Sequence, residues 1–507
     1  PDKLIDTLAY WYTENPPAKV RPRPNVRIRL CPIGVCISHP YEQCPRSAYF
    51  VKNLKAWSAI PNQLYIWHYN TNFTHYMAPM PDFDELAADI TLYQRNGVVG
   101  IFLEGAYGKG GGGENAELRS YIMARLLWDP RTDVNREVDG FLEAVYGRAS
   151  KPLRAYYDLL HHEVRLPPAG LGLHLWIFNL PSFSPGFYEQ AEKLLSEALA
   201  AADNDAVQAR VLQAMLPVEY MRMIAAREYQ VQGDTFAPVS LATVQAQFRQ
   251  FAAKLRSFGI GAISEGHDLE VDEKNVEAMR AWPVISLENA SWRVSVAPGL
   301  GGRILRMTSK SAGELLRIAK PGEREYPNVG GQVAQAFPDF PLRAWETAWT
   351  GSSTSATEAV LSGECPNGLK IERRIRLDGA WVRTETVAEN GSAGPLDVVL
   401  QTRADLEPGD IDQARVAWPK ERVLIRPGEQ PVGNETLKDA DVPAGEWSLR
   451  RAGMAEVTNR FDRTLAERAT FSWTAKGGSR VTLGVWSKKR TLQPGERLRI
   501  TADYSAK

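Results

Sequence analysis

The chain has 507 residues, and its 60 lysines and arginines are balanced by 60 aspartates and glutamates. A charge balance of this kind creates no long-range field that favours nucleic acid or an anionic membrane, so neither is expected as a partner. The length predicts about three domains. No apolar run approaches the roughly 20 residues that a membrane span needs, and no signal peptide is visible.

Two apolar segments near the start each end in polar or aromatic side chains. The first predicted strand, residues 5–11, runs into Tyr12 and Glu14, and the second, residues 26–30, ends at Cys31. Because the chain opens with Pro1 and enters a core strand within a few residues, we expect it to be the C-terminal part of a longer protein.

Three of the four cysteines crowd the loop after the second strand, together with His39. Thiolate and imidazole are the usual zinc ligands. However, the spacings match none of the paired zinc motifs, and three prolines indicate an irregular loop, so no metal is expected. Cys36 and Cys44 then form either a disulfide, if the protein is exported, or buried free thiols.

The next segment reads strand, loop, helix, strand and loop. Residues 64–70 and 98–103 are the strands, residues 83–96 form the helix, and Glu104 opens a glycine-rich loop that ends near Gly113. Active sites of α/β barrels lie at the C-terminal ends of the strands. A doubly wound sheet also binds ligands there. The four strands are therefore either the second half of a TIM-like (β/α)8 barrel or a small open sheet.

Glu104 is the best candidate for a catalytic carboxylate, because desolvation at the end of an apolar strand raises a carboxyl pKa toward general-acid function. The glycines after it would let a substrate approach the backbone. Alternatively, Glu104 caps the next helix or pairs with Lys109. Glu14 is the leading candidate for the second carboxylate, and Glu42 and Glu114 are weaker ones.

Aromatic and polar residues near the strand ends suit a sugar site, since pyranose rings offer an apolar face and hydroxyls. Within residues 64–70, Trp67 is expected in the core and Tyr69 nearer to solvent. His68 and His75 are each interpreted equally well as structural residues. The predicted substrate-binding residues are Trp11, Tyr12, His39, His68, Tyr69, Asn70, His75, Tyr107 and Lys109.

Three regions follow from these patterns. Residues 1–150 form the partial α/β barrel, which ends with helices at residues 115–125 and 136–146. Residues 151–281 have apolar positions three and four apart, which predicts a helical domain. Its helices are expected at residues 153–163, 185–202, 206–231 and 240–258.

Residues 282–507 change to short alternating runs separated by Gly, Pro, Asn and Asp, which predicts an antiparallel β-sandwich with one buried face to each sheet. Representative strands are expected at residues 292–296, 370–377, 381–387 and 398–400.

Several motifs in the first 160 residues resemble the domain of unknown function 4838 family. They are Leu8–Thr13, Ser38–Pro40, Ile66–Tyr69, Gly100–Gly105 and Leu126–Pro130. The resemblance implies a relationship to α-glucuronidases and other barrel glycoside hydrolases of polysaccharide-degrading bacteria. Relatives often carry aspartate where this chain has His68, so the chain departs from the pattern there.

The C-terminal region resembles the galactose-mutarotase-like sandwich through Pro298–Ile304 and Leu492–Glu496. Epimerisation in that family implies a paired general acid and base, usually histidine and glutamate. No histidine follows His267. We therefore expect a carbohydrate-binding or scaffolding module rather than an epimerase or lyase.

The predicted function is hydrolysis of a glycosidic bond in a polysaccharide or uronide by paired carboxylates, without a cofactor. The alternative is a non-catalytic carbohydrate-binding protein with a degenerate barrel. Export to a periplasm or the cell exterior is expected from the family resemblance. The sugar, the linkage and the oligomeric state are not encoded in any recognisable pattern.

Overall fold

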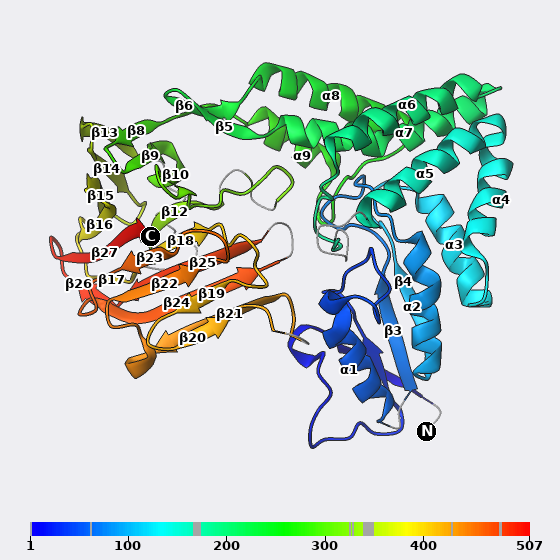
Figure 1. Cartoon of the computed structure of the whole chain (residues 1–507), viewed down its shortest axis with the longest axis horizontal. Coiled ribbons are helices and arrows are strands. Elements are labelled where there is room, and N and C mark those ends of the chain that lie inside the picture. The colour runs from blue at the N-terminus through cyan, green and yellow to red at the C-terminus, as the bar shows by residue number, and fades with distance from the viewer. Residues whose placement is uncertain are drawn as a thin grey trace. The chain divides into compact units, whose positions relative to one another are not determined.

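The computed structural model describes residues 3–60, 63–165, 174–323, 326, 329–337, 349–426, 429–475 and 479–507 (Figure 1). The chain divides into two compact units. The first unit comprises residues 1–226, 242–279 and 427–430, and the second comprises residues 227–241, 280–426 and 431–507. Among the helices in the described ranges, none is both long and apolar enough to span a lipid bilayer.

The first unit begins with a parallel sheet of four strands, paired in chain order: β1 (Ile5–Ala9), β2 (Val26–Leu30), β3 (Gln63–Tyr69) and β4 (Val98–Glu104). Helices α1 (Ala48–Ser58) and α2 (Phe83–Arg95) precede the third and fourth strands. The predicted parallel α/β region is confirmed, whereas α1 was not predicted.

Strand β3 shows why this sheet has two different faces. Leu64, Ile66 and His68 are buried, whereas Trp67 and Tyr69 are only half-buried. Successive side chains of a strand point to opposite faces, so the aromatic residues share the more open face. The expectation that Trp67 lies in the core is therefore wrong.

Except for α9 (Leu269–Glu277), which was not predicted, the remaining helices of the first unit confirm the predicted periodicity. In α5, Leu153, Tyr157, Leu160 and Val164 are buried at helical spacing. The bounds are α3 (Ala116–Trp128), α4 (Val134–Tyr146), α5 (Ser150–Arg165), α6 (Pro185–Ala201), α7 (Asp205–Ala226), α8 (Leu241–Ser257) and α9 (Leu269–Glu277).

The predicted helix over residues 206–231 is wrong at its end. Helix α7 ends at Ala226, and Val231 lies in β5 (Tyr229–Gln232), which pairs with β6 (Thr235–Pro238). Gly233 takes a positive φ of 61° between them. A two-residue loop of this kind closes a hairpin, which competes successfully with helix extension.

One hydrophobic core joins the sheet to helices α1 to α7 of the first unit. It extends along the chain from Ala9 to Val218 and includes Ile66 of β3 and Leu153 of α5. The predicted boundary at 150/151 therefore falls inside this core. The other predicted boundary, at 281/282, lies close to the division between the units at 279/280.

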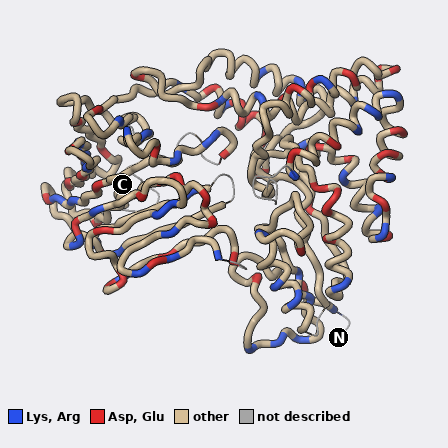
Figure 2. Tube along the Cα trace, in the orientation of Figure 1, with Lys and Arg blue, Asp and Glu red and all other residues tan. Residues whose placement is uncertain are grey.

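The second unit contains two antiparallel sheets of nine strands, as predicted for a sandwich. Strand β15 alternates strictly between buried and exposed residues, and Trp292, Ile375 and Trp447 belong to the core cluster of this unit. Both signs of charge are spread over the trace of the chain (Figure 2).

The strands of the first nine-stranded sheet are β8 (Ile285–Glu288), β9 (Trp292–Ala297), β10 (Arg303–Ser309), β11 (Gly313–Glu314), β12 (Gln332–Ala336), β18 (Leu400–Leu406), β21 (Val432–Lys438), β24 (Ala466–Thr474) and β25 (Arg480–Ser487). Those of the second are β13 (Thr350–Ser355), β14 (Glu358–Glu364), β15 (Leu369–Asp378), β16 (Trp381–Asn390), β19 (Arg415–Ala417), β20 (Glu421–Val423), β22 (Glu446–Arg450), β23 (Val457–Arg460) and β27 (Arg497–Ala506). The short strands are β7 (Trp282–Pro283), β17 (Leu396–Val398) and β26 (Arg490–Leu492).

Candidate functional site

A cavity of about 260 Å³ lies at the C-terminal ends of the parallel strands in the first unit. Strand ends of a parallel sheet are where ligand sites of α/β folds form. Aromatic and aliphatic side chains line the cavity together with two carboxylates. Its lining residues are Leu8, Tyr10, Cys31, Ile33, Trp67, Tyr69, Phe73, Glu104, Phe178 and Glu265.

Glu104 is the last residue of β4, as the sequence predicted, and its side chain is half-buried at the cavity. The indole Nε1 of Trp67 donates a hydrogen bond to Glu104 Oε2 over 2.6 Å. Burial raises the pKa of Glu104, the Trp67 hydrogen bond lowers it, and the negative charge of Glu265 raises it. The net effect is a raised pKa, so this carboxyl group keeps its proton to a higher pH than an ordinary glutamate does.

Glu265 is the second carboxylate of the cavity, and sequence reasoning missed it. It lies in the loop between α8 and α9, and its backbone N–H donates to Phe73 O over 2.7 Å. The hydroxyl of Tyr107 donates to Glu265 Oε1 over 2.5 Å, which raises the pKa of Tyr107 to about 12. The only sequence signal was a polar stretch, Ser264–Asp268, between two helices.

Close backbone approaches hold the Glu265 loop against the glycine-rich loop after Glu104. Gly261 N–H donates to Lys109 O over 2.8 Å. A Cβ built on Gly110 would lie 1.9 Å from Gly259 O, and Gly110 has a φ of +87°. These glycines were expected to admit a substrate; in the structure Gly110 instead admits the backbone of another loop.

The aromatic wall of the cavity comes from two distant segments. Tyr69 and Phe73 meet edge to face at 5.8 Å between ring centroids, and Phe178 lies 6.2 Å from Phe73. Phe178 is 41% exposed. Aromatic rings beside carboxylates provide a flat apolar surface and hydrogen-bond acceptors in the same cavity.

Of the residues predicted from sequence, Glu104 and Tyr69 line this cavity, and Tyr107 holds Glu265. Trp11 and Tyr12, in the 3-10 turn Trp11–Thr13, are 69% and 88% exposed and lie outside its lining. Lys109 is exposed, and its carbonyl accepts the hydrogen bond from Gly261.

Three other predicted residues are buried and lie outside the lining of the cavity. His68 Nδ1 lies 3.1 Å from the Tyr93 hydroxyl, and burial lowers the pKa of His68 to about 4. His75 Nδ1 lies 2.7 Å from the Tyr220 hydroxyl. Asn70 is buried, and its N–H donates to Glu104 O over 2.8 Å. The two histidines thus contact helices α2 and α7, and none of the three residues lines the cavity.

Glu14 does not belong to the lining of the cavity. Its carboxylate is buried and accepts a hydrogen bond from Asn53 Nδ2 over 3.3 Å, and its backbone oxygen accepts one from Trp57 Nε1 over 2.8 Å. Both partners belong to α1, the helix that sequence reasoning overlooked.

The two weaker carboxylate candidates also have structural partners. Glu114 is buried and pairs with Arg119 over 2.7 Å, and burial raises the pKa of Glu114 to about 7. Glu42 pairs with Lys55 over 3.7 Å and with Arg95. His39 lies apart from the cavity, beside Cys36, Cys44 and His174.

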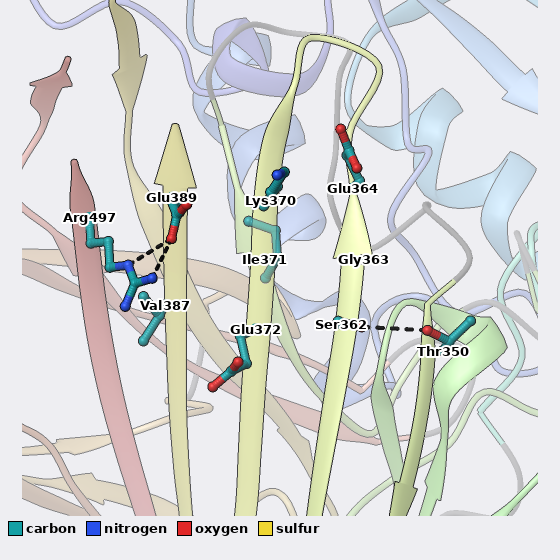
Figure 3. A pocket seen from close by; sticks show the side chains of 10 residues that line it. All are labelled: Thr350, Ser362, Gly363, Glu364, Lys370, Ile371, Glu372, Val387, Glu389 and Arg497. Atoms are coloured by element: carbon teal, nitrogen blue, oxygen red, sulfur yellow. Dashed lines mark hydrogen bonds and ion pairs between the residues drawn. The ribbon is translucent and has the colours of Figure 1, made fainter. Parts of the chain in front are cut away.

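A larger cavity, of about 590 Å³, lies on the sandwich over the strands that contain Glu364, Glu372, Glu389 and Arg497 (Figure 3). Arg497 Nη2 pairs with Glu389 over 2.6 Å. None of the ten described residues that line it is aromatic, and the pattern is that of the outward face of an antiparallel sheet. This cavity therefore lacks the stacking surface that the smaller one has.

Comparison with known proteins gives one family and several similar structures. No curated protein matches the chain. The Slr1438 protein of Synechocystis sp. is 14% identical, with 44% of this chain and 95% of that one covered and a TM-score of 0.37. A galactose mutarotase-like protein of Lactobacillus casei is 11% identical, with 44% and 100% covered and a TM-score of 0.35. An aldose epimerase homologue of C. elegans is 11% identical, with 44% of this chain and 98% of that one covered and a TM-score of 0.31.

The family predicted from motifs in the N-terminal region is confirmed. Residues 1–158 match the family model described as domain of unknown function DUF4838, and this range holds the parallel sheet and Glu104. The chain thus carries a DUF4838 domain at its N-terminal end.

Proposed function

We propose that the cavity of the first unit binds a sugar and hydrolyses its glycosidic bond. The observation that carries this proposal is that two carboxylates, Glu104 and Glu265, line one cavity whose wall is aromatic. Most glycoside hydrolases place a pair of carboxyl groups on either side of the scissile bond, which is cleaved through an oxocarbenium-like transition state.

The two carboxylates have different surroundings, which suits different roles. Glu104 has a raised pKa because it is partly desolvated and senses the charge of Glu265. It is the general acid that protonates the leaving oxygen. Glu265, which accepts a hydrogen bond from Tyr107, is the base or nucleophile.

The size and charge of the cavity narrow the substrate class. A volume of about 260 Å³ is just below the range of ~300–1,000 Å³ typical of small-molecule sites, so it accommodates roughly one sugar ring. None of the ten described lining residues is a lysine or arginine. A neutral sugar therefore fits this cavity better than a uronate.

A non-catalytic sugar-binding role is the second candidate. Trp67 Nε1 and Tyr107 OH donate hydrogen bonds to the two carboxylates over 2.6 Å and 2.5 Å. Such bonds stabilise ionised carboxylates, which then accept hydrogen bonds from sugar hydroxyls without transferring protons.

Hydrolysis of a panel of aryl glycosides and aryl uronides tests the proposal. Glu104→Gln and Glu265→Gln are each expected to lower kcat/KM by about 10² to 10⁴, the usual contribution of general acid–base catalysis. Glu143→Gln, which alters an exposed carboxylate on α4, is the matched control and should match the parent.

The panel also separates the two candidates. Sugar binding detected by calorimetry without cleavage of any glycoside would favour the binding protein. Cleavage that survives in both glutamine variants would place the chemistry elsewhere. Neutral glycosides cleaved more slowly than uronides would overturn the assignment of substrate class.

A further inference from the structure

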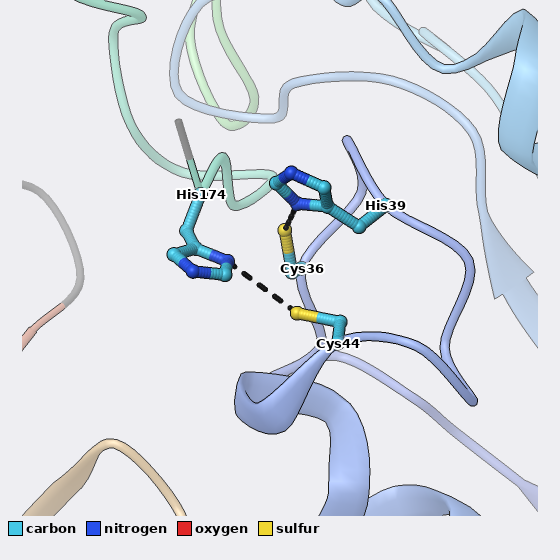
Figure 4. Close-up of side chains that lie close together, drawn as sticks. All are labelled: Cys36, His39, Cys44 and His174. Carbon is cyan, nitrogen blue, oxygen red and sulfur yellow. Dashed lines mark hydrogen bonds between the residues drawn. The ribbon is translucent and has the colours of Figure 1, made fainter. Parts of the chain in front are cut away.

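Four potential metal ligands gather outside the candidate site. Cys36, His39, Cys44 and His174 each offer a sulfur or ring nitrogen, and these four atoms all lie within 4.8 Å of one another (Figure 4). The two cysteines are buried and free, and the two histidines are half-buried. Two thiols and two imidazoles form the Cys2His2 set that structural zinc sites use.

The spacing of these atoms matches a single tetrahedral ion. Cys36 Sγ lies 3.3 Å from His39 Nδ1, and Cys44 Sγ lies 3.4 Å from His174 Nδ1. Zinc bonds of about 2.3 Å to sulfur and about 2.0 Å to nitrogen, at a tetrahedral angle, separate the two ligand atoms by roughly 3.6 Å. Small side-chain movements are therefore enough to place all four around one centre.

Backbone hydrogen bonds bring the distant histidine to the loop. Ile37 N–H donates to Leu175 O over 2.9 Å, and Leu175 N–H donates to Ser38 Oγ over 3.3 Å. The N–H of Cys36 donates to Ser47 Oγ over 3.1 Å. The loop and the segment containing His174 are thus fixed side by side before any ion binds.

We propose that Cys36, His39, Cys44 and His174 bind one Zn²⁺ ion. Four protein ligands leave no open coordination position, so the ion is structural rather than catalytic. Calcium and magnesium prefer oxygen ligands, which this set does not offer. The proposal does not depend on the function proposed for the cavity.

The structural consequence concerns the segment at residues 174–179. Ile177 O accepts a hydrogen bond from Phe73 N–H over 2.9 Å, and Asn179 O accepts one from Asn72 Nδ2 over 2.7 Å. The same segment carries Phe178, which lines the cavity. Zinc at His174 therefore fastens one end of the segment that supplies part of the aromatic wall.

Metal analysis of the full chain, purified under reducing conditions and without an affinity tag that binds metal, tests the proposal. We expect about one zinc ion per chain, and less than about 0.1 in Cys44→Ser and in His174→Ala. Cys365→Ser and His162→Ala are matched controls, because these residues lie outside the cluster, and both should retain the parent content.

Two measurements on the parent protein cover the case in which the variants do not fold. Zinc removed with a chelator and replaced by Co²⁺ should give the d–d absorption of tetrahedral cobalt with a thiolate charge-transfer band. Hydrogen exchange at residues 174–179 should be faster in the zinc-free protein than in the zinc-loaded protein.

Three results would overturn the proposal. One is freshly purified protein that lacks zinc and takes up neither Zn²⁺ nor Co²⁺ after reduction. Another is a Cys36–Cys44 disulfide found by peptide mapping of the native protein. The third is zinc content that both cluster variants retain in full.

Discussion

Opposing effects act on the pKa of Glu104. Burial and the charge of Glu265 raise its pKa, and the indole N–H of Trp67 lowers it. If Glu104 is the general acid, activity requires its protonated form, so kcat/KM should fall as the pH rises through its pKa. The pH at which this falling limb of the kcat/KM profile lies therefore reports on the environment of Glu104.

Trp67→Phe tests this account at the residue scale. The change removes the hydrogen bond that favours the ionised form, so the pKa of Glu104 should rise further and the falling limb should move to higher pH. The measurement is the pH dependence of kcat/KM on the best glycoside of the panel. Trp128→Phe, at an 88% exposed position, should leave the limb in place. A limb that stays fixed or moves to lower pH in Trp67→Phe would contradict the assignment.

At the scale of elements, the site depends on how closely two loops pack. Gly110 and Gly111 both have positive φ, but a Cβ on Gly110 would lie 1.9 Å from Gly259 O, whereas a Cβ on Gly111 meets nothing within 4 Å. Alanine at either position would therefore carry the same kind of cost for a positive φ. Only alanine at Gly110 would also collide with Gly259 O.

Gly110→Ala should consequently displace the loop that leads to Glu265, whereas Gly111→Ala should not. A misplacement of about 1 Å can cost roughly 10²-fold in rate, so we expect a loss of that order in kcat/KM for Gly110→Ala. Amide exchange at Gly261, whose N–H donates to Lys109 O, should also accelerate in that variant. Equal effects of the two substitutions on exchange would show that backbone strain alone matters.

At the scale of the whole molecule, the chain has separate hydrophobic cores in its two units. Trp447 is 2% exposed in the core of the second unit, and its Nε1 donates to Asn459 Oδ1 over 2.7 Å. Leu54 is fully buried in the core of the first unit. Distinct cores predict two calorimetric transitions rather than one.

Trp447→Ala should therefore lower one transition, by about 3–5 kcal/mol in unfolding free energy, because it leaves a large cavity. Leu54→Ala should lower the other transition, by about 2–5 kcal/mol. Differential scanning calorimetry checks both. A single transition that moves with either substitution would mean that the two units unfold as one.

Much of the fold follows from local patterns in the sequence. Alternation in residues 370–377 predicted β15, helical spacing of apolar residues in 153–163 predicted α5, and the apolar run that ends at Glu104 predicted β4. These features depend on which residues face a core, and that periodicity is present in the chain itself. The DUF4838 motifs are likewise local.

The composition of the site was decided by tertiary structure. By itself, the sequence determined the four parallel strands, most helices, the alternating sheets and the place of Glu104. Only the folded chain brings Glu265 to Glu104, His174 to Cys44 and Phe178 to Phe73. The physical reason is that loop backbones meet through specific close contacts, such as Gly110 against Gly259, and such contacts leave no periodic pattern in the sequence.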